Sequence, residues 1–260
     1  MVPPPHIPTR PFDRSRVAFQ PIFGPEGRVH GLEALMRFFP AGLANESPAS
    51  ALSTESVFEA ARREGRIMEL DFYCRQQAMA EIAEQSFAGL LFLNINPASL
   101  LNESHSVGRT DDLAERYGIP KERIVLEITE ETAIQDYALF ARTVEHYRDQ
   151  GYRIAIDDFG SGYAGLKMLA SIRPDYLKID RYFVSEIHRE PVKHSIVSAL
   201  VRICDSLGIH LVAEGIESGS EFHSILNLGV EFRQGYYFCH PVFQLSDIPG
   251  CIPEEVSHEV

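Results

Sequence analysis

Two adjacent aspartates, Asp157 and Asp158, end an apolar run in the segment AIDDFGSGYAGL at residues 155–166. Two neighbouring negative charges repel each other, and burial disfavours the charged form of each carboxylate. Such a pair needs a counter-charge. A divalent cation bound by both carboxylates would provide it.

Other apolar segments also end in, or contain, a polar side chain. These side chains are Glu33, Asn94, Glu127, Lys178, Glu214 and Gln234. A single acid at a strand end is most often the N-cap of the next helix. That explanation fails for the set, because Glu33 and Glu214 lie inside apolar runs and glutamate is a poor capping residue. So many carboxylates cannot all stay ionised together, and Lys178 supplies only one positive charge.

The types of side chain indicate which cation would neutralise them. Carboxylates and an amide oxygen, without histidine or cysteine, are typical ligands of Mg²⁺ or Mn²⁺ rather than Zn²⁺. Two such ions about 4 Å apart are the usual arrangement for phosphoester cleavage. One of the two adjacent aspartates could then bridge the ions while the other reaches the second ion, so we expect two Mg²⁺ or Mn²⁺ ions per site.

The elements that must position these side chains alternate between strands and helices. Apolar runs predict the strands, and amphipathic runs between them predict the helices. The predicted strands are 17–23, 29–38, 90–96, 123–129, 153–157, 176–180, 210–215 and 232–238. The predicted helices are 53–85 with a break near Gly65, 111–118, 136–150, 164–171, 192–207 and 217–229.

This alternation predicts an α/β fold, a (β/α)8 TIM-like barrel. Most of the strands are continuously apolar, as expected when both faces of a parallel sheet are buried. The first two strands are joined by GPEG without a helix, which predicts an antiparallel first strand. The carboxyl ends of the parallel strands meet on one face of such a barrel, and this would gather the polar side chains.

A dinucleotide-binding alternative comes from the G-x-G-x-x-G pattern at residues 160–165. It follows a strand, precedes a helix and has Asp180 about 20 residues further on. The two aspartates stand before these glycines, where they would repel a pyrophosphate. We therefore interpret the glycines as a loop beside the metal ions.

Composition restricts the partners and the compartment. The formal net charge is -13, so the chain has no general attraction for nucleic acid polymers or acidic membranes. The four cysteines are scattered, which favours a reducing, cytoplasmic location over a disulfide framework. There is no membrane span and no signal-peptide h-region. Residues 1–14 are proline-rich, and either a plain tail or a linker from an upstream regulatory or sensor domain would explain them.

The ordered motifs of the chain resemble those of the EAL-domain family, the bacterial phosphodiesterases of cyclic di-GMP. Each motif is short, but together they cover residues 17–241. In order they are QPI (20–22), EALMR (33–37), FLNIN (92–96), EITE (127–130), DDFGSGY (157–163), KID (178–180), AEGIE (213–217) and QGYYF (234–238) followed by Pro241.

The resemblance implies roles for individual positions. It implies catalytic roles for Lys178, Glu214 and Asp157, with Lys178 orienting or deprotonating the attacking water. A lysine that acts as a base needs a lowered pKa; a structural salt bridge from Lys178 to Asp180 or another acid is the alternative. The implied metal ligands are Glu33, Asn94, Glu127, Asp157, Asp158 and Glu214. The implied substrate-binding residues are Gln20, Leu35, Arg37 and Gln234, and the implied loop anchors are Glu130 and Ser161.

The expected function is metal-dependent hydrolysis of cyclic di-GMP to linear pGpG by a phosphodiesterase domain at residues 15–248, followed by a tail at 249–260. The resemblance also implies a homodimer. A receptor of the same fold that binds cyclic di-GMP without cutting it is one alternative. A barrel glycosidase is another, although it would use only two of the acids.

Overall fold

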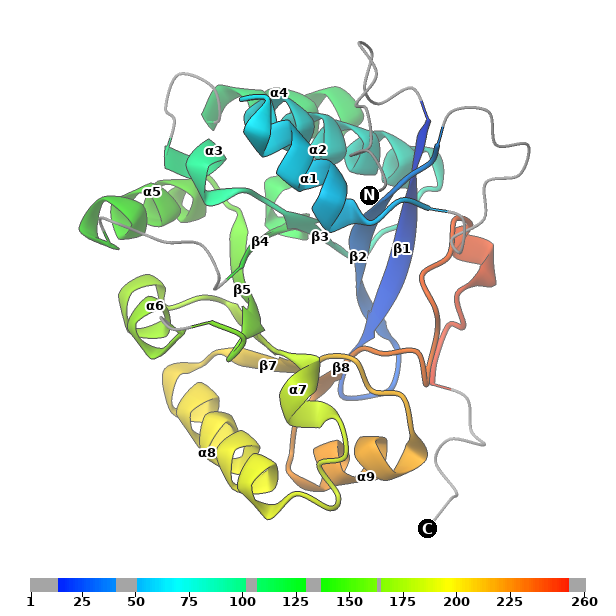
Figure 1. Ribbon diagram of the computed structural model, residues 1–260, viewed down its shortest axis with the longest axis vertical. Helices are drawn as coiled ribbons and strands as arrows, with labels where there is room; N and C mark the ends of the chain where they lie inside the picture. The colour runs from blue at the N-terminus through cyan, green and yellow to red at the C-terminus, as the bar shows by residue number, and fades with distance from the viewer. Residues whose placement is uncertain (1–13, 41–50, 102–106, 130–136, 163–164, 253–260) are drawn as a thin grey trace, which may run out of the picture.

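The computed structural model describes residues 14–40, 51–101, 107–129, 137–162 and 165–252 as a closed eight-stranded barrel surrounded by helices (Figure 1). The strands are β1 (Ser15–Phe23), β2 (Val29–Phe38), β3 (Leu90–Asn94), β4 (Ile124–Thr129), β5 (Arg153–Phe159), β6 (Tyr176–Ile179), β7 (His210–Ala213) and β8 (Phe232–Arg233). The helices are α1 (Thr54–Arg63), α2 (Ile67–Glu84), α3 (Pro97–Leu101), α4 (Val107–Tyr117), α5 (Tyr137–Asp149), α6 (Gly165–Ile172), α7 (Arg181–Val184), α8 (Pro191–Leu207) and α9 (Gly219–Asn227), with 3-10 turns η2 (Lys121–Arg123) and η3 (Leu245–Asp247).

The strands are hydrogen-bonded in sequence order, and the barrel closes between β8 and β1. β1 is antiparallel to both of its neighbours, whereas the pairs from β2 to β8 are parallel. The predicted (β/α)8 barrel with an antiparallel first strand is therefore confirmed. Because the sheet is closed, the open sheet of the dinucleotide-binding alternative is excluded.

Local sequence signals explain where several helices begin and end. Ser53 caps α1, and its side chain accepts a hydrogen bond from the backbone of Ser56. α8 begins with Pro191, whose missing N–H group is not needed in a first turn, and ends at Gly208 in the left-handed region. No helix in the described ranges combines the length and the apolar character needed to cross a bilayer.

The last strand is shorter than the sequence pattern predicts. A strand was expected over 232–238, but β8 contains only Phe232 and Arg233. The chain leaves the sheet because the backbone of Gly235 packs directly against that of Ile216, and the Tyr237 N–H donates to the Ile216 carbonyl at 3.0 Å. The aromatic residues of this segment lie in a turn beyond the sheet.

The inside of the barrel has two layers. One layer is apolar and consists of Ile22, Leu90, Phe92, Val125, Ala155, Tyr176, Val212 and Phe232. Side chains alternate between the faces of a strand, so a residue two positions further on also points inward. Two positions further along β3 to β6, and directly after the ends of β7 and β8, the apolar layer gives way to Asn94, Glu127, Asp157, Lys178, Glu214 and Gln234. Gln20 and Glu33, which are partners across β1 and β2, complete this polar layer.

Candidate active site

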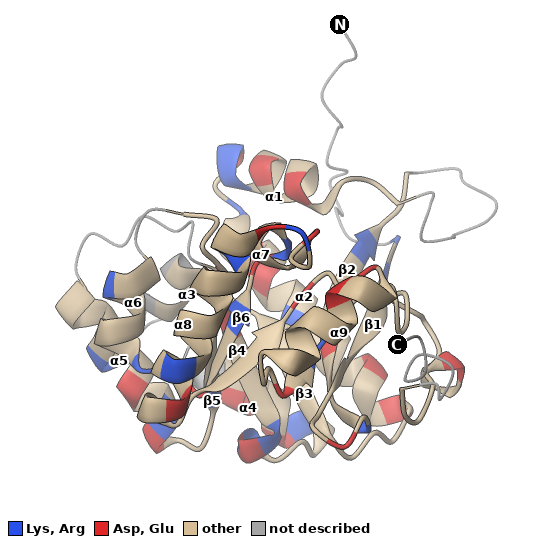
Figure 2. Cartoon of the chain, turned by 90° about the horizontal axis from the view of Figure 1, so that it is seen from below, with Lys and Arg blue, Asp and Glu red and all other residues tan. Residues whose placement is uncertain are grey.

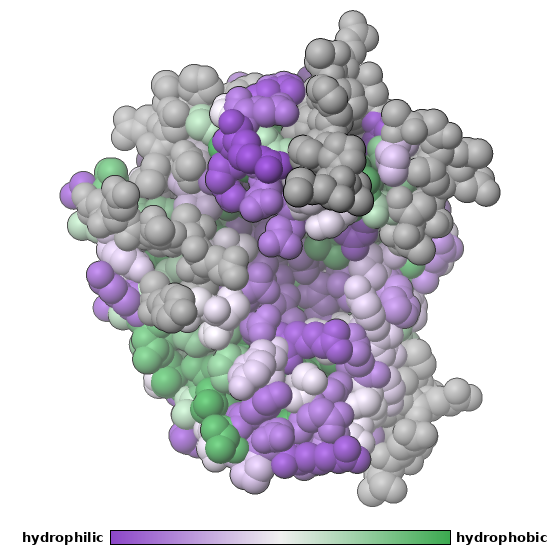
Figure 3. All heavy atoms as spheres, viewed as in Figure 1, coloured by the Kyte–Doolittle hydropathy of each residue, from purple (hydrophilic) through white to green (hydrophobic). Residues whose placement is uncertain are grey.

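Lys178 lies at the centre of the polar layer and is completely buried. Its Nζ is 2.7 Å from Glu127 Oε1 and from Glu214 Oε1. It is 2.8 Å from Asp157 Oδ1 and 3.2 Å from Glu33 Oε2. The face seen down the barrel is hollowed at its centre, and hydrophilic residues line the hollow (Figure 3). Five different strands or strand ends thus direct four carboxylates and one ammonium to one point.

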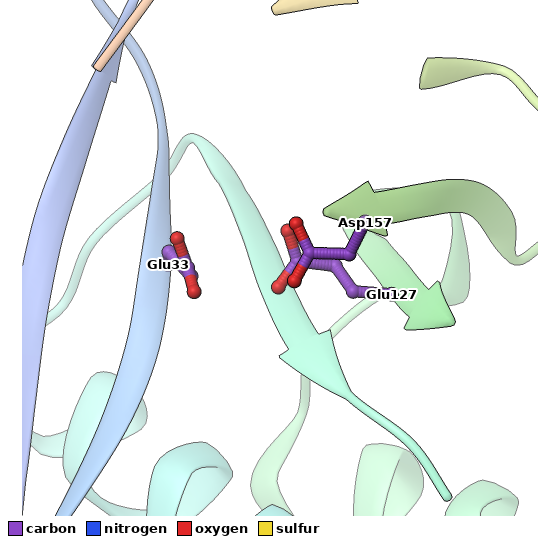
Figure 4. Close-up of side chains that lie close together, drawn as sticks. All are labelled: Glu33, Glu127 and Asp157. Carbon is purple, nitrogen blue, oxygen red and sulfur yellow. The ribbon is translucent and has the colours of Figure 1, made fainter. Parts of the chain in front are cut away.

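The carboxylates form two overlapping groups that could each hold a metal ion. Glu33, Glu127 and Asp157 place ligand oxygens within 4.8 Å of one another, and so do Asp157, Asp158 and Glu214. Glu127 and Asp157 extend from β4 and β5 toward Glu33 on β2 (Figure 4). Asp157 belongs to both groups, as required of a residue that bridges two cations.

These residues fit a hard divalent cation. The donor atoms of both groups are carboxylate oxygens, which Mg²⁺ and Mn²⁺ prefer. Glu127 Oε1 and Asp157 Oδ1 are buried and lack a hydrogen bond of acceptable geometry, although both are close to Lys178 Nζ. One ammonium has three N–H groups and cannot satisfy four carboxylates. Asn94, exposed at the end of β3, donates to Glu127 Oε2 at 3.4 Å and stands beside the same group.

Burial and mutual repulsion favour the protonated carboxyl groups. Burial raises the pKa of Glu127 well above its ordinary value, and Lys178 offsets this only in part. Glu214 shows the same shift with the same leading cause, burial. Burial, followed by repulsion from Asp157, raises the pKa of Asp158 to about 7. A bound cation would reverse these shifts, because it stabilises the ionised carboxylates.

Lys178 is held as an ammonium by the protein groups around it. Burial lowers its pKa, but the surrounding carboxylates outweigh burial and the net shift is well above the ordinary value. This is opposite to the lowered pKa expected of a base. Asp180 was a possible partner for Lys178, but it is the N-cap of α7 and accepts from the Tyr182 N–H at 2.8 Å.

Gln20 and Gln234 lie behind Glu33 and are buried. Gln234 Nε2 donates to Glu33 Oε2 at 2.7 Å and to Gln20 Oε1 at 3.2 Å. Gln20 Nε2 in turn donates to the Cys239 carbonyl at 3.3 Å. This chain of amides holds the Glu33 carboxylate in place.

A pocket of about 810 Å³ lies between β2, β3, α1 and α2 and shares Asn94 with the polar layer. Leu35, Arg37 and Asn94 contribute to its wall, and Arg62 reaches it from α1. The half-buried Arg37 donates from Nη1 to the Met36 carbonyl at 3.0 Å. Burial lowers the pKa of Arg37, and Tyr236 and Glu33 oppose this shift. The volume lies in the range of small-molecule sites.

The loop after β5 begins with a constrained backbone. Asp158 has a φ of 51°, in the left-handed region that residues other than glycine rarely occupy, and such positions cluster at functional sites. Its carbonyl accepts from the N–H of the exposed Ser161 at 3.0 Å. Glu130, the other expected loop anchor, lies outside the described residues.

Two supporting acids were not predicted from the sequence. Asp71 is buried on α2, pairs with Arg75 at 2.7 Å and accepts from the Asn96 N–H at 2.9 Å, two residues beyond Asn94. Glu221 accepts three backbone N–H groups, including that of Glu217 in the loop that follows Glu214. The capping-box spacing from Ser218 to Glu221 was a readable signal for the second acid.

Comparisons with known proteins all point to the same family. The model of the EAL domain matches residues 12–241. The chain is 29% identical over 234 residues to cyclic di-GMP phosphodiesterase PdeR of Escherichia coli strain K12, covering 88% of this chain and 34% of PdeR. Three curated relatives, PdeR among them, are matched over 34–55% of their own length.

Solved structures agree with the barrel fold. The cyclic di-GMP-bound form of a standalone EAL protein from Vibrio cholerae O395 has a TM-score of 0.79 and 34% identity, covering 95% of this chain and 98% of that chain. BlrP1 of Klebsiella pneumoniae, in a manganese and cyclic di-GMP complex, has a TM-score of 0.78 and 32% identity, covering 92% of this chain and 58% of that chain.

Proposed function

Because the chain belongs to the EAL domain family, we propose that it hydrolyses one phosphodiester bond of cyclic di-GMP and releases linear pGpG. The observation that carries this proposal is the position of Lys178, within 3.2 Å of four carboxylates, one of which is common to two possible cation groups. A glycosidase would use only two of these acids.

The proposed metal ligands are the acids of the two overlapping groups together with Asn94. Glu33 and Glu127 belong to the first group, Asp158 and Glu214 to the second, and Asp157 to both. Two Mg²⁺ or Mn²⁺ ions held there would supply acidification of a water molecule and neutralisation of phosphate charge. The manganese complex of BlrP1 supports this choice of ion.

Lys178 would hold and orient the attacking water. Its ammonium donates to the water oxygen while Glu214 and Asp157 fix the position of Nζ. The water oxygen forms a bond to phosphorus as the bond from phosphorus to the 3′ oxygen breaks. The proton lost by the water finally resides on the leaving 3′ oxygen, which leaves a 5′ phosphate and a free 3′ hydroxyl.

The pocket that shares Asn94 with the polar layer would bind the rest of the substrate. Arg37, which lines this pocket, would contact a phosphate, and Leu35 would offer an apolar wall beside it. We propose that the buried Gln20 and Gln234 act on the substrate through Glu33, whose carboxylate they position. Cyclic di-GMP in the Vibrio relative supports this class of ligand.

We further propose a homodimer, a cytoplasmic location and regulation by a domain in the same polypeptide. The last point is supported by the curated relatives, of which the matched region is only a part. Sedimentation of the protein with and without cyclic di-GMP tests the dimer.

The direct test is to incubate the purified protein with cyclic di-GMP and Mg²⁺ or Mn²⁺ and to separate the products by chromatography. We expect linear pGpG to accumulate. Asp157→Asn should abolish turnover, whereas Asp149→Asn, which removes an exposed acid of α5, should retain it. Intact substrate at high enzyme concentration, together with tight binding, would instead assign the receptor role.

A further inference from the structure

We propose that Arg62 binds the phosphate of the cyclic dinucleotide that is not cleaved, and thereby selects substrates with two phosphates. This inference rests on the proposed function, because it concerns the substrate of the same site. No motif of the sequence pointed to Arg62. The structure brings it to the pocket from α1, a helix outside the barrel strands.

The position of α1 is tied to the end of β2, where Arg37 lies. The Thr54 hydroxyl donates to the Met36 carbonyl at 3.3 Å, and the same carbonyl accepts from Arg37 Nη1 at 3.0 Å. An isolated antiparallel β-bridge between Phe38 and Leu52 fixes the segment that leads into α1. α1 lies at the upper rim of the molecule in Figure 2, with basic residues at one end. The pocket wall therefore runs from Asn94 and Arg37 to the last turn of α1.

The other arginines near this pocket are already engaged. Arg75 is buried in its pair with Asp71 at 2.7 Å, and Arg66 binds Glu69 at 2.9 Å. Arg62 is exposed and, within the described part of the chain, has no carboxylate partner. Arg63 is the next residue of the same helix and does not line the pocket. Among the described residues that line the pocket, Arg62 and Arg37 are thus the cations without a carboxylate partner.

The charge of the substrate favours a second cationic contact. Cyclic di-GMP carries two phosphodiesters, and attack at the carboxylate cluster uses one of them. The other phosphate must be placed in a chain with a net charge of -13, where the general field is repulsive. A guanidinium can bind two phosphate oxygens in one plane, which an ammonium cannot. Since Arg62 is exposed, its contribution is modest, and truncating it should weaken binding by a factor of about 3 to 10.

The test compares Arg62→Ala and Arg63→Ala on two substrates. Cyclic di-GMP has a second phosphate, whereas bis(p-nitrophenyl) phosphate has one phosphate and no nucleoside. We expect Arg62→Ala to raise the KM for cyclic di-GMP at least threefold. The ratio of kcat/KM for cyclic di-GMP to kcat/KM for bis(p-nitrophenyl) phosphate should fall by the same factor. Arg63→Ala removes an equal charge from the same helix and should leave both substrates unaffected. Equal behaviour of the two variants would overturn the inference.

Competition by cyclic di-AMP separates phosphate recognition from base recognition. This nucleotide has the same two phosphates but different bases. Arg62→Ala should weaken inhibition by cyclic di-AMP about as much as it weakens binding of cyclic di-GMP; an effect confined to cyclic di-GMP would overturn the assignment to phosphate. If the wild-type protein cleaves cyclic di-GMP and Arg62→Ala does so with unchanged KM, only this inference fails. If the wild-type protein cleaves none, the proposed function fails first.

Discussion

The ammonium of Lys178 lies 2.7 Å from Oε1 of Glu127, and neither side chain has any exposed surface. Removing one partner of a buried ion pair leaves an uncompensated buried charge, at a cost of about 3–5 kcal/mol. The environment already raises the pKa of Glu127. The carboxyl group can therefore take a proton when the ammonium is lost.

Lys178→Met should lower the free energy of unfolding by roughly 3 kcal/mol at pH 7 in the presence of a chelator. The loss should be smaller at pH 5, because protonation of the clustered carboxyl groups replaces the missing cation. Urea denaturation at both pH values measures this. Arg142→Met, at an exposed position of α5, should change stability by less than about 0.5 kcal/mol at either pH. A larger loss at pH 5 than at pH 7 would contradict the role of Lys178 as counter-ion.

Divalent metal should stabilise the fold through the same carboxylates. A ligand present at 100 times its Kd adds about 2.7 kcal/mol to a protein that binds it only when folded. Mn²⁺ should therefore raise the Tm of the wild-type protein, and a chelator should remove the increase. Asp157→Asn should lose most of it, since Asp157 belongs to both groups. The control Asp149→Asn should keep it, and an equal Tm increase in both variants would refute the assignment of the ligands.

At the other end of the barrel, His30 makes the free energy of unfolding depend on pH. Its Nε2 is 2.8 Å from the Tyr176 hydroxyl, and burial, aided by His210 and Arg153, lowers its pKa to about 4. Between pH 6.5 and pH 4 the unfolded chain binds a proton that the folded chain excludes. The free energy of unfolding therefore decreases as the pH falls through this window, by at most about 3 kcal/mol. Above pH 6.5 the effect vanishes, because histidine is neutral in both states.

His30→Gln isolates this contribution from the carboxyl groups that titrate in the same range. The difference in unfolding free energy between wild type and variant should change in favour of the variant as the pH is lowered from 7 to 4.5. Chemical denaturation at several pH values gives this difference directly. A constant difference would show that His30 does not titrate below its ordinary range.

The polar layer could be predicted because it follows from the alternation of side chains along a strand. In β4 to β6, a buried apolar residue at one inward position is followed two residues later by Glu127, Asp157 or Lys178. Once the strands are placed in a barrel, these inward residues must converge. This is a local pattern, and the sequence contains it in full.

Features that depend on packing between distant segments could not be predicted in this way. The sequence gives no sign that Arg62 faces the pocket while Arg63 does not, since this depends on how α1 is attached to β2. The raised pKa of Lys178 results from carboxylates on four other strands or strand ends. The early end of β8 results from a contact between Gly235 and Ile216, which no periodicity reveals.

Gly235→Ala should damage both stability and the site. A Cβ atom at this position would lie 2.1 Å from the Ile216 carbonyl oxygen and 2.3 Å from its nitrogen, so one backbone must move. Overpacking of this kind costs about 1–3 kcal/mol, and the movement would pull Gln234 away from Glu33. We expect the midpoint of denaturation to fall and turnover of cyclic di-GMP to drop at least tenfold. Gly250→Ala adds the same methyl group where no atom beyond the two neighbouring residues in the chain lies within 4 Å, and it should behave as wild type. Turnover that stays normal in Gly235→Ala despite lower stability would show that Gln234 does not position Glu33 for catalysis.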